Sequence, residues 1–313
     1  RTTICNGRAD LCNRSYGNVT FIGAHDSFTF SSDPLALART QTEDLTSQLE
    51  SGVRLLQAQS HMSNGVLHFC HTSCLLFDGG TVANYLTTVK QFLDKNPNEV
   101  LTLLFTNPEG VSVSTIWDPI FNSTGMSELA YVPPSIPAKQ SEWPTLSEMI
   151  QSGKRVVVFM DFNTNTSAVP YILPEFEMVW ETPFDVVNSS FPCSIDRISG
   201  PLADEDHMNL LNHFLDIQFP FNITIPYEVA ANTTNSVSSI LNESRGCLPL
   251  NGGRNPNFIL IDWVSIGNAT GAANLLNSGI INGDASFRAQ TFWSLAWMVM
   301  IWSWWTVLTQ TSS

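Results

Sequence analysis

Short apolar runs that read as β-strands recur along this chain of 313 residues, with helical or loop stretches between them. Seven runs are clear and an eighth is weaker; they cover 19–24, 53–60, 66–70, 100–106, 155–161, 177–181 and 257–264, with 208–215 as the weaker one. Runs that are continuously apolar and alternate with helices indicate a parallel sheet covered on both faces. The pattern therefore predicts an α/β fold.

Helical periodicity supports this alternation. Residues 82–96 carry apolar side chains at helical spacing, and Asn96-Pro97-Asn98 ends the segment. Segments 45–51 and 146–151 are predicted as helices before the second and fifth strands, and the Ser-, Thr- and Asn-rich segment 222–244 as a glycosylated surface excursion. Eight strands fit a TIM-type (β/α)8 barrel in a single domain. The alternative, an open doubly wound sheet, lacks a glycine-rich phosphate loop after its first strand.

Charge excludes one class of partner. The chain has 28 acidic and 14 basic residues, a formal net charge of −14, and no run of basic residues. Nucleic acids and anionic lipid surfaces both attract patches of Lys and Arg. We therefore expect no nucleic-acid partner and no electrostatic docking on anionic lipid.

Six cysteines permit three disulfides. Sequence proximity favours Cys5–Cys12 and Cys70–Cys74, which leaves Cys193–Cys247. A zinc site is the rival interpretation, because Cys70, His71 and Cys74 lie close together, but no second cysteine pair completes it.

Sequons for N-glycosylation indicate the secretory pathway. Nine Asn-x-Ser/Thr sequences are present, at Asn13, Asn18, Asn122, Asn165, Asn188, Asn222, Asn232, Asn242 and Asn268. A single match is weak, but nine together with six cysteines indicate an extracellular glycoprotein. The chain begins at Arg1 without an apolar leader, so we expect that a signal peptide has been removed.

The C-terminal segment is apolar from Phe292 to Leu308, and no charged residue follows it. A small-residue cluster at 282–286 and a short polar spacer precede it, which is the pattern for a glycosylphosphatidylinositol (GPI) anchor. An ordinary transmembrane or core helix is the alternative. We therefore expect a disulfide-linked extension over 1–16, the barrel over 17–278, and a spacer with a GPI-attachment-type tail over 279–313.

Two histidines each follow a strand-like run. His25 lies in Gly23-Ala24-His25-Asp26-Ser27 and His71 in His68-Phe69-Cys70-His71-Thr72. Imidazoles are the usual groups for proton transfer near neutral pH. In a barrel, polar residues at the carboxyl ends of strands line the active site. The residues expected there are His25, Asp26, His71, Asn107, Asp161, Glu181 and Asp262.

The motifs resemble the catalytic X domain of phosphatidylinositol-specific phospholipases C, and most of all secreted fungal phospholipase-C-like phosphodiesterases. The resemblance rests on the His25 motif, the opening of the second strand at 51–56 and the His71 motif. It extends to the Cys-His-Thr-Ser-Cys turn at 70–74, to Asn-Pro-Asn-Glu-Val at 96–100 and to the late strand 256–262, and covers roughly residues 17–270.

The resemblance implies a TIM-type barrel that cleaves a phosphodiester with two histidines. His25 would act as general base on the inositol 2-hydroxyl, which attacks phosphorus, and His71 would protonate the departing diacylglycerol oxygen. Asp26 would support the acid and Asp262 would orient the base. The expected substrate is a phosphoinositide or inositol-linked glycolipid, with no cofactor and no metal.

The second strand departs from the family pattern. It reads Gln57-Ala58-Gln59 where bacterial members carry an aspartate and an arginine and animal members carry calcium ligands. Neutral amides donate hydrogen bonds but supply no positive charge, and they make a poor calcium site. The alternative function is therefore a catalytically weak or inactive barrel that binds ligand at the cell surface.

Other substrate-binding candidates complete the expected site. They are Gln57, Gln59, Asn107, Asp161, Glu181 and Trp263. As an acid pair, Asp161 and Glu181 would suggest a glycoside hydrolase, but that function leaves both histidine motifs unexplained. A glycerophosphodiesterase would need acidic metal ligands near the first histidine, and none is evident.

Overall fold

The computed structural model describes residues 4–33 and 35–279, except for the side chains of Asn222 and Ile223. Its main unit spans 1–273, and a second unit, 274–313, lies mostly outside the described residues. The main unit holds the sheet and the candidate site described below. The predicted C-terminal anchor segment falls outside the described residues.

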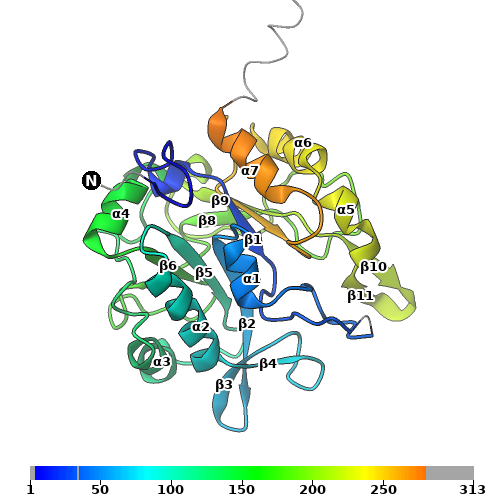
Figure 1. Cartoon of the computed structure of the whole chain (residues 1–313), viewed down its shortest axis with the longest axis horizontal. Helices are drawn as coiled ribbons and strands as arrows, with labels where there is room; N and C mark the ends of the chain where they lie inside the picture. The colour runs from blue at the N-terminus through cyan, green and yellow to red at the C-terminus, as the bar shows by residue number, and fades with distance from the viewer. Residues whose placement is uncertain (1–3, 34, 280–313) are drawn as a thin grey trace, which may run out of the picture. The chain divides into compact units, whose positions relative to one another are not determined.

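Eight parallel strands form the central sheet of the main unit (Figure 1). Their spatial order is β7-β6-β5-β2-β1-β12-β9-β8, and each neighbouring pair is parallel. The strands are β1 Phe21–Ala24, β2 Leu55–Ser63, β5 Leu101–Thr106, β6 Val156–Met160, β7 Ile172–Pro174, β8 Val179–Glu181, β9 Met208–Asn212 and β12 Phe258–Ile261. The predicted TIM-type α/β fold is confirmed, with no ladder between β7 and β8 among the described residues.

The third predicted strand is not a barrel strand. β3 (Val66–Cys70) pairs antiparallel with β2 and continues into β4 (Asp78–Thr81), so it extends from the barrel as a hairpin. The turn is Asn64-Gly65, whose positive φ angles of 50° and 80° are typical of a tight hairpin turn. The eighth barrel strand is β7, which has only three residues and was not predicted because it is too short to show a pattern.

Helices connect the strands, and three of them, over 45–50, 82–95 and 146–152, match the predicted helices. The main ones are α1 Leu45–Glu50, α2 Val82–Lys95, α3 Asp118–Ser123, α4 Leu146–Ser152, α5 Ala231–Thr234, α6 Val237–Cys247 and α7 Ala269–Ser278. Short 3-10 turns occupy Tyr16–Asn18, Gln140–Glu142, Asp204–Asp206, Pro220–Asn222 and Glu228–Ala230, and Val113–Trp117 is a π-helical turn. A capping box between Thr145 and Glu148 starts α4, and Gly153 at φ 75° ends it.

Segment 222–244 is more ordered than predicted. It holds strand β11 (Ile223–Pro226), which pairs with β10 (Asp216–Phe219), and it continues into α5 and most of α6. Ile240 and Cys247 of α6 are buried. The polar composition concealed this helix because most of its surface faces outward.

The interior of the barrel is apolar below the carboxyl ends of the strands. Leu55, Leu104, Phe159 and Leu260 belong to one buried cluster. Gly23 on β1 leaves room for Leu55 and Leu260, since a Cβ there would lie 2.6 Å from Leu55 and 3.0 Å from Leu260. The glycine before the His25 motif is therefore a packing requirement.

Three disulfides join the six cysteines, as sequence proximity predicts. The bridges are Cys5–Cys12, Cys70–Cys74 and Cys193–Cys247, and no cysteine is free. Because the thiols of Cys70 and Cys74 are bonded to each other, the rival zinc site is excluded.

The described sequon asparagines are all exposed. These are Asn13, Asn18, Asn122, Asn165, Asn188, Asn232, Asn242 and Asn268. The side chain of Asn222 lies outside the described residues. Glycosylation at these positions stays a prediction. Among the described helices, none combines the length and the apolar character needed to cross a bilayer.

Candidate active site

His25 and Asp262 meet because their strands are neighbours. β1 and β12 pair with Ala24 opposite Ile261, so the next residue of each strand lies at the same edge. Nδ1 of His25 lies 2.8 Å from Oδ1 of Asp262, and the His25 ring stacks on Phe214 with centroids 4.0 Å apart. The carboxylate and the aromatic ring together fix the imidazole.

His71 reaches the same place from the β3 hairpin. The Cys70–Cys74 bridge closes its turn, and Thr72 has a left-handed φ of 61°. Nδ1 of His71 lies 2.5 Å from the carbonyl oxygen of Ala38. Because a carbonyl only accepts, this nitrogen carries a proton, and Nε2 is the atom left for chemistry.

Asp26 lies between the two rings. Its Oδ2 is 3.7 Å from Nε2 of His25 and 3.5 Å from Nε2 of His71, and the ring centroids are 6.3 Å apart. Asp26 is buried, and its Oδ1 accepts a hydrogen bond of 3.2 Å from the backbone N–H of Gln59. The structure thus places four of the predicted residues in one cluster, with both Nε2 atoms facing a single carboxylate.

Neighbouring carboxylates set the charge of His25. Burial by itself would lower the pKa of His25, but Asp262, Asp26 and Asp216 outweigh it and raise that pKa to about 9. Burial raises the pKa of Asp262, and the contacts with His25 offset this only in part. Burial and the neighbouring charge of Asp262 raise the pKa of Asp216 to about 7.

The two glutamines of β2 are held in one orientation. Oε1 of Gln57 accepts a 2.7 Å hydrogen bond from the backbone N–H of Asp26, and Oε1 of Gln59 accepts one of 2.6 Å from that of Thr72. Asp26 and Thr72 directly follow His25 and His71, so each glutamine lies beside one histidine. Neither amide nitrogen has an acceptor among the described residues. Each glutamine therefore offers an N–H2 donor.

The described residues place no Lys or Arg in an ion pair or hydrogen bond with His25, His71, Asp26 or Asp262. Arg54 bonds instead to Glu99 and to the carbonyl oxygens of Leu49 and Val53, before its strand reaches the site. The cluster therefore has no positive charge of its own beyond the imidazoles.

Four other predicted residues have different surroundings. Asn107 is fully buried, and its side chain bonds to backbone groups of Val111 and Phe162, so it braces the loop after β5. Trp263 is buried beside the rim groove described below. Their substrate-binding roles stay predictions, and both side chains are buried.

Glu181 and Asp161 lie on the β6–β8 side of the site. Glu181 is buried and bonded to Arg197. Burial raises the pKa of Asp161, whose Oδ1 accepts from the backbone N–H of Asn107. Because Arg197 already pairs with Glu181, the two acids do not form a free catalytic pair.

Sequence reasoning missed three residues that contribute to the site. Phe214 stacks on His25, Asp216 raises the pKa of His25, and the carbonyl of Ala38 fixes His71. Ala38 and Phe214 lie in the loops after β1 and β9, Asp216 is the first residue of β10, and no local motif marks them. Only the fold brings them to the histidines.

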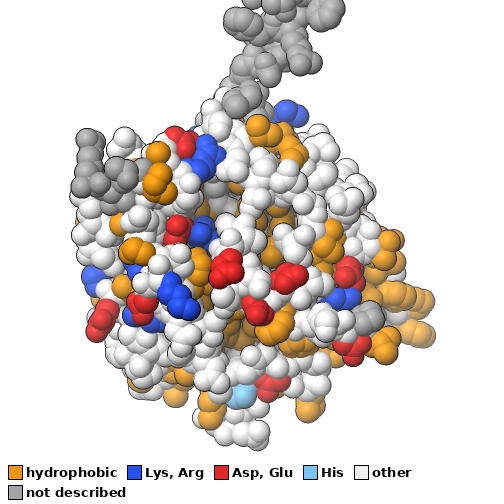
Figure 2. Space-filling model, in the orientation of Figure 1, with side chains coloured by type: hydrophobic (Ala, Val, Ile, Leu, Met, Phe, Trp, Pro, Cys, Tyr) orange, Lys and Arg blue, Asp and Glu red, His pale blue; other side chains and the backbone are white. Residues whose placement is uncertain are grey.

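An apolar rim surrounds part of this end of the barrel. Leu37, from the loop after β1, and Phe219 and Val229, from the hairpin region after β9, line one groove and are exposed. Phe221, at the tip of the β10–β11 hairpin, is 96 % exposed. Figure 2 shows orange side chains gathered over this hairpin at the right of the view. Such a patch marks an interaction surface.

Known proteins resemble this chain in sequence. Residues 11–277 match the family described as PI-PLC X 1. An "Uncharacterized secreted protein" of Arthroderma benhamiae is 40 % identical over 299 residues, which cover 92 % of this chain and 67 % of the relative. A "PI-PLC X domain-containing protein 1" of the same fungus is 40 % identical over 280 residues, 88 % of this chain and 89 % of the relative.

Solved structures show the same fold at low identity. The phosphatidylinositol-specific phospholipase C of Listeria monocytogenes superimposes with a TM-score of 0.52 at 17 % identity, over 85 % of this chain and 94 % of that one. A Staphylococcus aureus phosphatidylinositol-specific phospholipase C gives a TM-score of 0.57 at 14 % identity, over 85 % and 94 %.

Proposed function

The chain belongs to the PI-PLC X-domain family, and from that premise we propose that it cleaves the phosphodiester of a phosphatidylinositol-type lipid or an inositol-linked glycolipid. The observation that carries the proposal is the geometry of the two imidazoles. Each Nδ1 has a fixed partner, and each Nε2 faces the same oxygen of Asp26. This arrangement suits one proton acceptor and one proton donor acting on a single phosphate.

The proposed reaction is an internal transfer. Nε2 of His25 takes the proton of the inositol 2-hydroxyl, whose oxygen forms a bond to phosphorus. The bond from phosphorus to the diacylglycerol oxygen breaks, and Nε2 of His71 gives that oxygen a proton. The products are a cyclic inositol phosphate and diacylglycerol. Asp262 orients the base, and Asp26 supports the acid.

We propose that Gln57 and Gln59 replace the missing cation. Their oxygens are held by backbone N–H groups, so both N–H2 groups are available to the negatively charged phosphate oxygens. Preorganised donors of this kind stabilise developing charge without a full positive charge. The pair would act as a neutral anion hole.

Removing these donors is expected to lower activity without unfolding the protein. A hydrogen bond to a charged group contributes about 1.5–3 kcal/mol, so Gln57→Leu or Gln59→Leu should each reduce kcat/KM roughly 10- to 150-fold. Gln57→Glu keeps the acceptor for Asp26 but adds negative charge, and it should be at least as damaging. Gln91→Leu, at an exposed position on α2, is the matched control. Full activity in both β2 variants would exclude the anion hole.

The apolar rim suits a lipid substrate. With a net charge of −14 the chain gains little from Coulomb attraction to anionic lipid, so burial of exposed apolar side chains must supply the binding energy. We propose that the rim defined by Leu37, Phe219, Phe221 and Val229 contacts the bilayer while the histidines reach the headgroup.

Polar substitutions on the rim test this contact. Phe221→Ser with Val229→Ser should weaken binding to phosphatidylinositol vesicles at least 10-fold, because burying a Phe or Val side chain contributes about 1.5–3 kcal/mol each. Val132→Ser is the control, since Val132 is also exposed but adjoins the start of β6, at the opposite end of the strands. Vesicle co-sedimentation measures the effect. Equal weakening by the control would contradict a localised contact surface.

The activity itself is tested with two substrates. The purified protein is incubated with phosphatidylinositol vesicles and, separately, with GPI-anchored glycoproteins. Phosphorus NMR detects the cyclic phosphate, and phase partitioning detects release of the glycoprotein. Turnover of one substrate or both supports the proposal, and which one is cleaved identifies the substrate class.

A binding function is the second candidate, and the absence of a Lys or Arg contact to the cluster among the described residues favours it. In that case calorimetry would detect inositol phosphate binding with no turnover of either substrate. Loss of binding in His25→Ala would then place the ligand at this cluster.

We propose an extracellular location. The relative from Arthroderma benhamiae is called a secreted protein, and the exposed sequons and three disulfides agree with an oxidising compartment. We further propose a barrel over 17–278 behind a disulfide-linked extension over 1–16, with GPI attachment replacing the tail within 279–313. Release of the protein from cells by an anchor-cleaving enzyme would test the attachment.

A further inference from the structure

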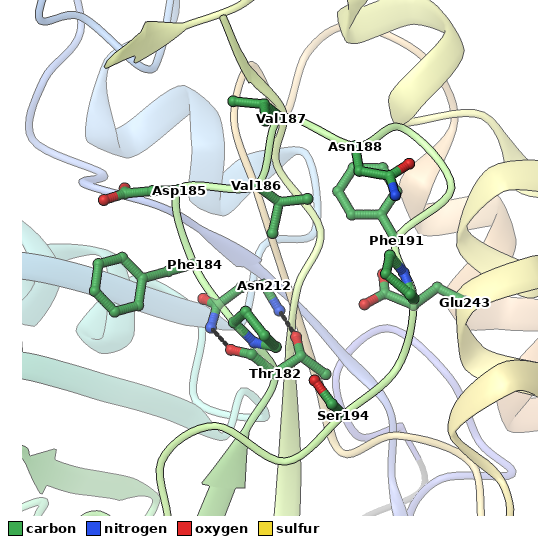
Figure 3. A pocket seen from close by; sticks show the side chains of 12 residues that line it. Thr182, Phe184, Asp185, Val186, Val187, Asn188, Phe191, Ser194, Asn212 and Glu243 are labelled. Carbon is green, nitrogen blue, oxygen red and sulfur yellow. Dashed lines mark hydrogen bonds between the residues drawn. The ribbon is translucent and has the colours of Figure 1, made fainter. Parts of the chain in front are cut away.

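A second cavity opens on the β8–β9 side of the barrel (Figure 3). Its volume is about 280 Å³, close to the lower end for small-molecule sites. Thr182, Val186 and Asn188 of the loop after β8 line it, together with Asn212 at the end of β9 and Glu243 of α6. None of these residues bonds to His25 or His71, so we treat it as separate from the histidine cluster and name it the β8–β9 cavity.

Two buried side chains leave an oxygen unused in this cavity. Asn212 is 2 % exposed, and its amide nitrogen donates to the carbonyl of Thr182 at 2.7 Å, while its oxygen accepts no hydrogen bond from the described residues. Glu243 is 3 % exposed. Its Oε2 bonds to His213, and its Oε1 accepts no hydrogen bond from the described residues. Both oxygens keep some accessible surface, and both residues line the cavity.

Glu243 already has a buried partner. Nδ1 of His213 bonds to its carboxyl group, and Nε2 of His213 lies 2.8 Å from the carbonyl oxygen of Thr234 and 3.2 Å from Oγ of Ser239. The cavity therefore has no need of a cationic ligand, and its carboxylate disfavours an anionic one. The two acceptor oxygens that have no partner favour a neutral ligand with O–H or N–H donors.

The walls of the cavity are apolar. Val186 extends into it in Figure 3, and Pro183, Val187, Phe191 and Pro192 contribute further apolar surface. Apolar walls with a few placed acceptors suit a ring that has C–H faces and hydroxyl edges. A sugar ring has this chemistry and is small enough for the volume.

We propose that the β8–β9 cavity is a carbohydrate site, occupied by the first sugar of an N-glycan on Asn188. Asn188 is a sequon asparagine on the cavity wall. Its oxygen accepts from the N–H and hydroxyl of Ser190 at 3.0 and 2.8 Å, which leaves its amide nitrogen without a described partner. That nitrogen is the atom to which an N-linked sugar is attached, so the sugar begins at the edge of the cavity.

The experiment uses the full chain made in a glycosylating eukaryotic host. Asn165 is the matched control, because its oxygen also accepts within its own turn and it does not line the cavity. Native protein is treated with an endoglycosidase, and peptide mass spectrometry follows sugar loss at both positions. Melting temperatures are measured for wild type, Asn188→Gln, Asn165→Gln, Val186→Phe and the Asn188→Gln/Val186→Phe double variant. Phenylalanine at position 186 fills the cavity.

If the glycan of Asn188 occupies the cavity, it resists release at least 10-fold longer than that of Asn165. Asn188→Gln then lowers the melting temperature by about 2 °C or more, and this loss disappears in the Val186→Phe background. The enzymatic comparison needs only wild-type protein, so the test stands even if Val186→Phe does not fold.

A second arm distinguishes a sugar supplied from outside. N-acetylglucosamine is added to Asn188→Gln protein, and saturation-transfer NMR reports binding. One combination of results is that the sugar binds, that Val186→Phe abolishes this binding, and that the Asn188 glycan shows no protection. This combination supports a carbohydrate site but assigns it to an external ligand. Equal glycan release at both positions together with no N-acetylglucosamine binding overturns the proposal. None of these measurements depends on phosphodiesterase activity.

Discussion

Replacing either His25 or His71 by alanine should lower kcat for phosphatidylinositol cleavage by about 10²- to 10⁴-fold, the usual contribution of a positioned general acid or base. The two Nε2 atoms face one carboxylate oxygen, at 3.7 and 3.5 Å, so we expect them to act on the same phosphate. Because the residues act as a unit, the double variant should be little worse than either single variant.

Headgroup release from radiolabelled vesicles measures these rates. His68→Ala is the matched control, since His68 lies on the same β3 strand and pairs with Asp78 outside the cluster. Undiminished turnover in His25→Ala, or an equal loss in His68→Ala, would end the claim of two-histidine catalysis. Circular dichroism on each variant separates loss of function from loss of fold.

The pH dependence should change strongly when the partner of His25 is neutralised. In wild type the pKa of His25 is raised to about 9, so the neutral base becomes available only toward alkaline pH. We expect kcat/KM to rise with the fraction of neutral His25, about 10-fold per pH unit below that value, as long as His71 keeps the proton that it donates. In Asp262→Asn the main raising charge is gone while burial still lowers the pKa, so the rise should move to lower pH by about 2 units or more, with a lower plateau.

Protonation of His25 also makes the free energy of unfolding depend on pH. Since the folded-state pKa of His25 is raised from 6.5 to about 9, its stabilisation is fully present below pH 6.5 and is lost as pH rises through 9. Urea unfolding of wild type should show this loss, and Asp262→Asn should not. Asp94→Asn, an exposed acid on α2 that pairs with Lys90, serves as control for both measurements. Superimposable pH profiles for wild type and Asp262→Asn would show that Asp262 does not set the base.

Local pattern was enough to predict the sheet and to name the four residues of the cluster, although it placed His71 on a barrel strand. His25 and Asp262 follow apolar runs, and parallel neighbours place such residues at one edge. β3 was misplaced because an antiparallel hairpin strand and a buried parallel strand have the same short apolar pattern. β7 was missed because three residues show no period. Both errors arise because these strands are short, not because of their composition.

The remaining site residues depend on contacts between distant segments. Phe214 reaches His25 from the loop after β9, and Asp216 acts on it from the first position of β10. The side chain of Asn107 is hydrogen-bonded to backbone groups near the end of its own strand. The orientation of Gln57 and Gln59 follows from two backbone N–H groups that only the folded chain places nearby. A sequence identifies which side chains can donate or accept, but not which of them are already satisfied.

The short bridge from Cys70 to Cys74 has a consequence for the cell that makes this chain. The bond closes the turn that holds His71, the proposed acid. In a reducing compartment the two sulfurs stay unbonded and that turn stays open, whereas the oxidising lumen of the secretory pathway closes it. Entry into that lumen would then complete the catalyst, and the inositol lipids that face the cytosol would stay out of its reach.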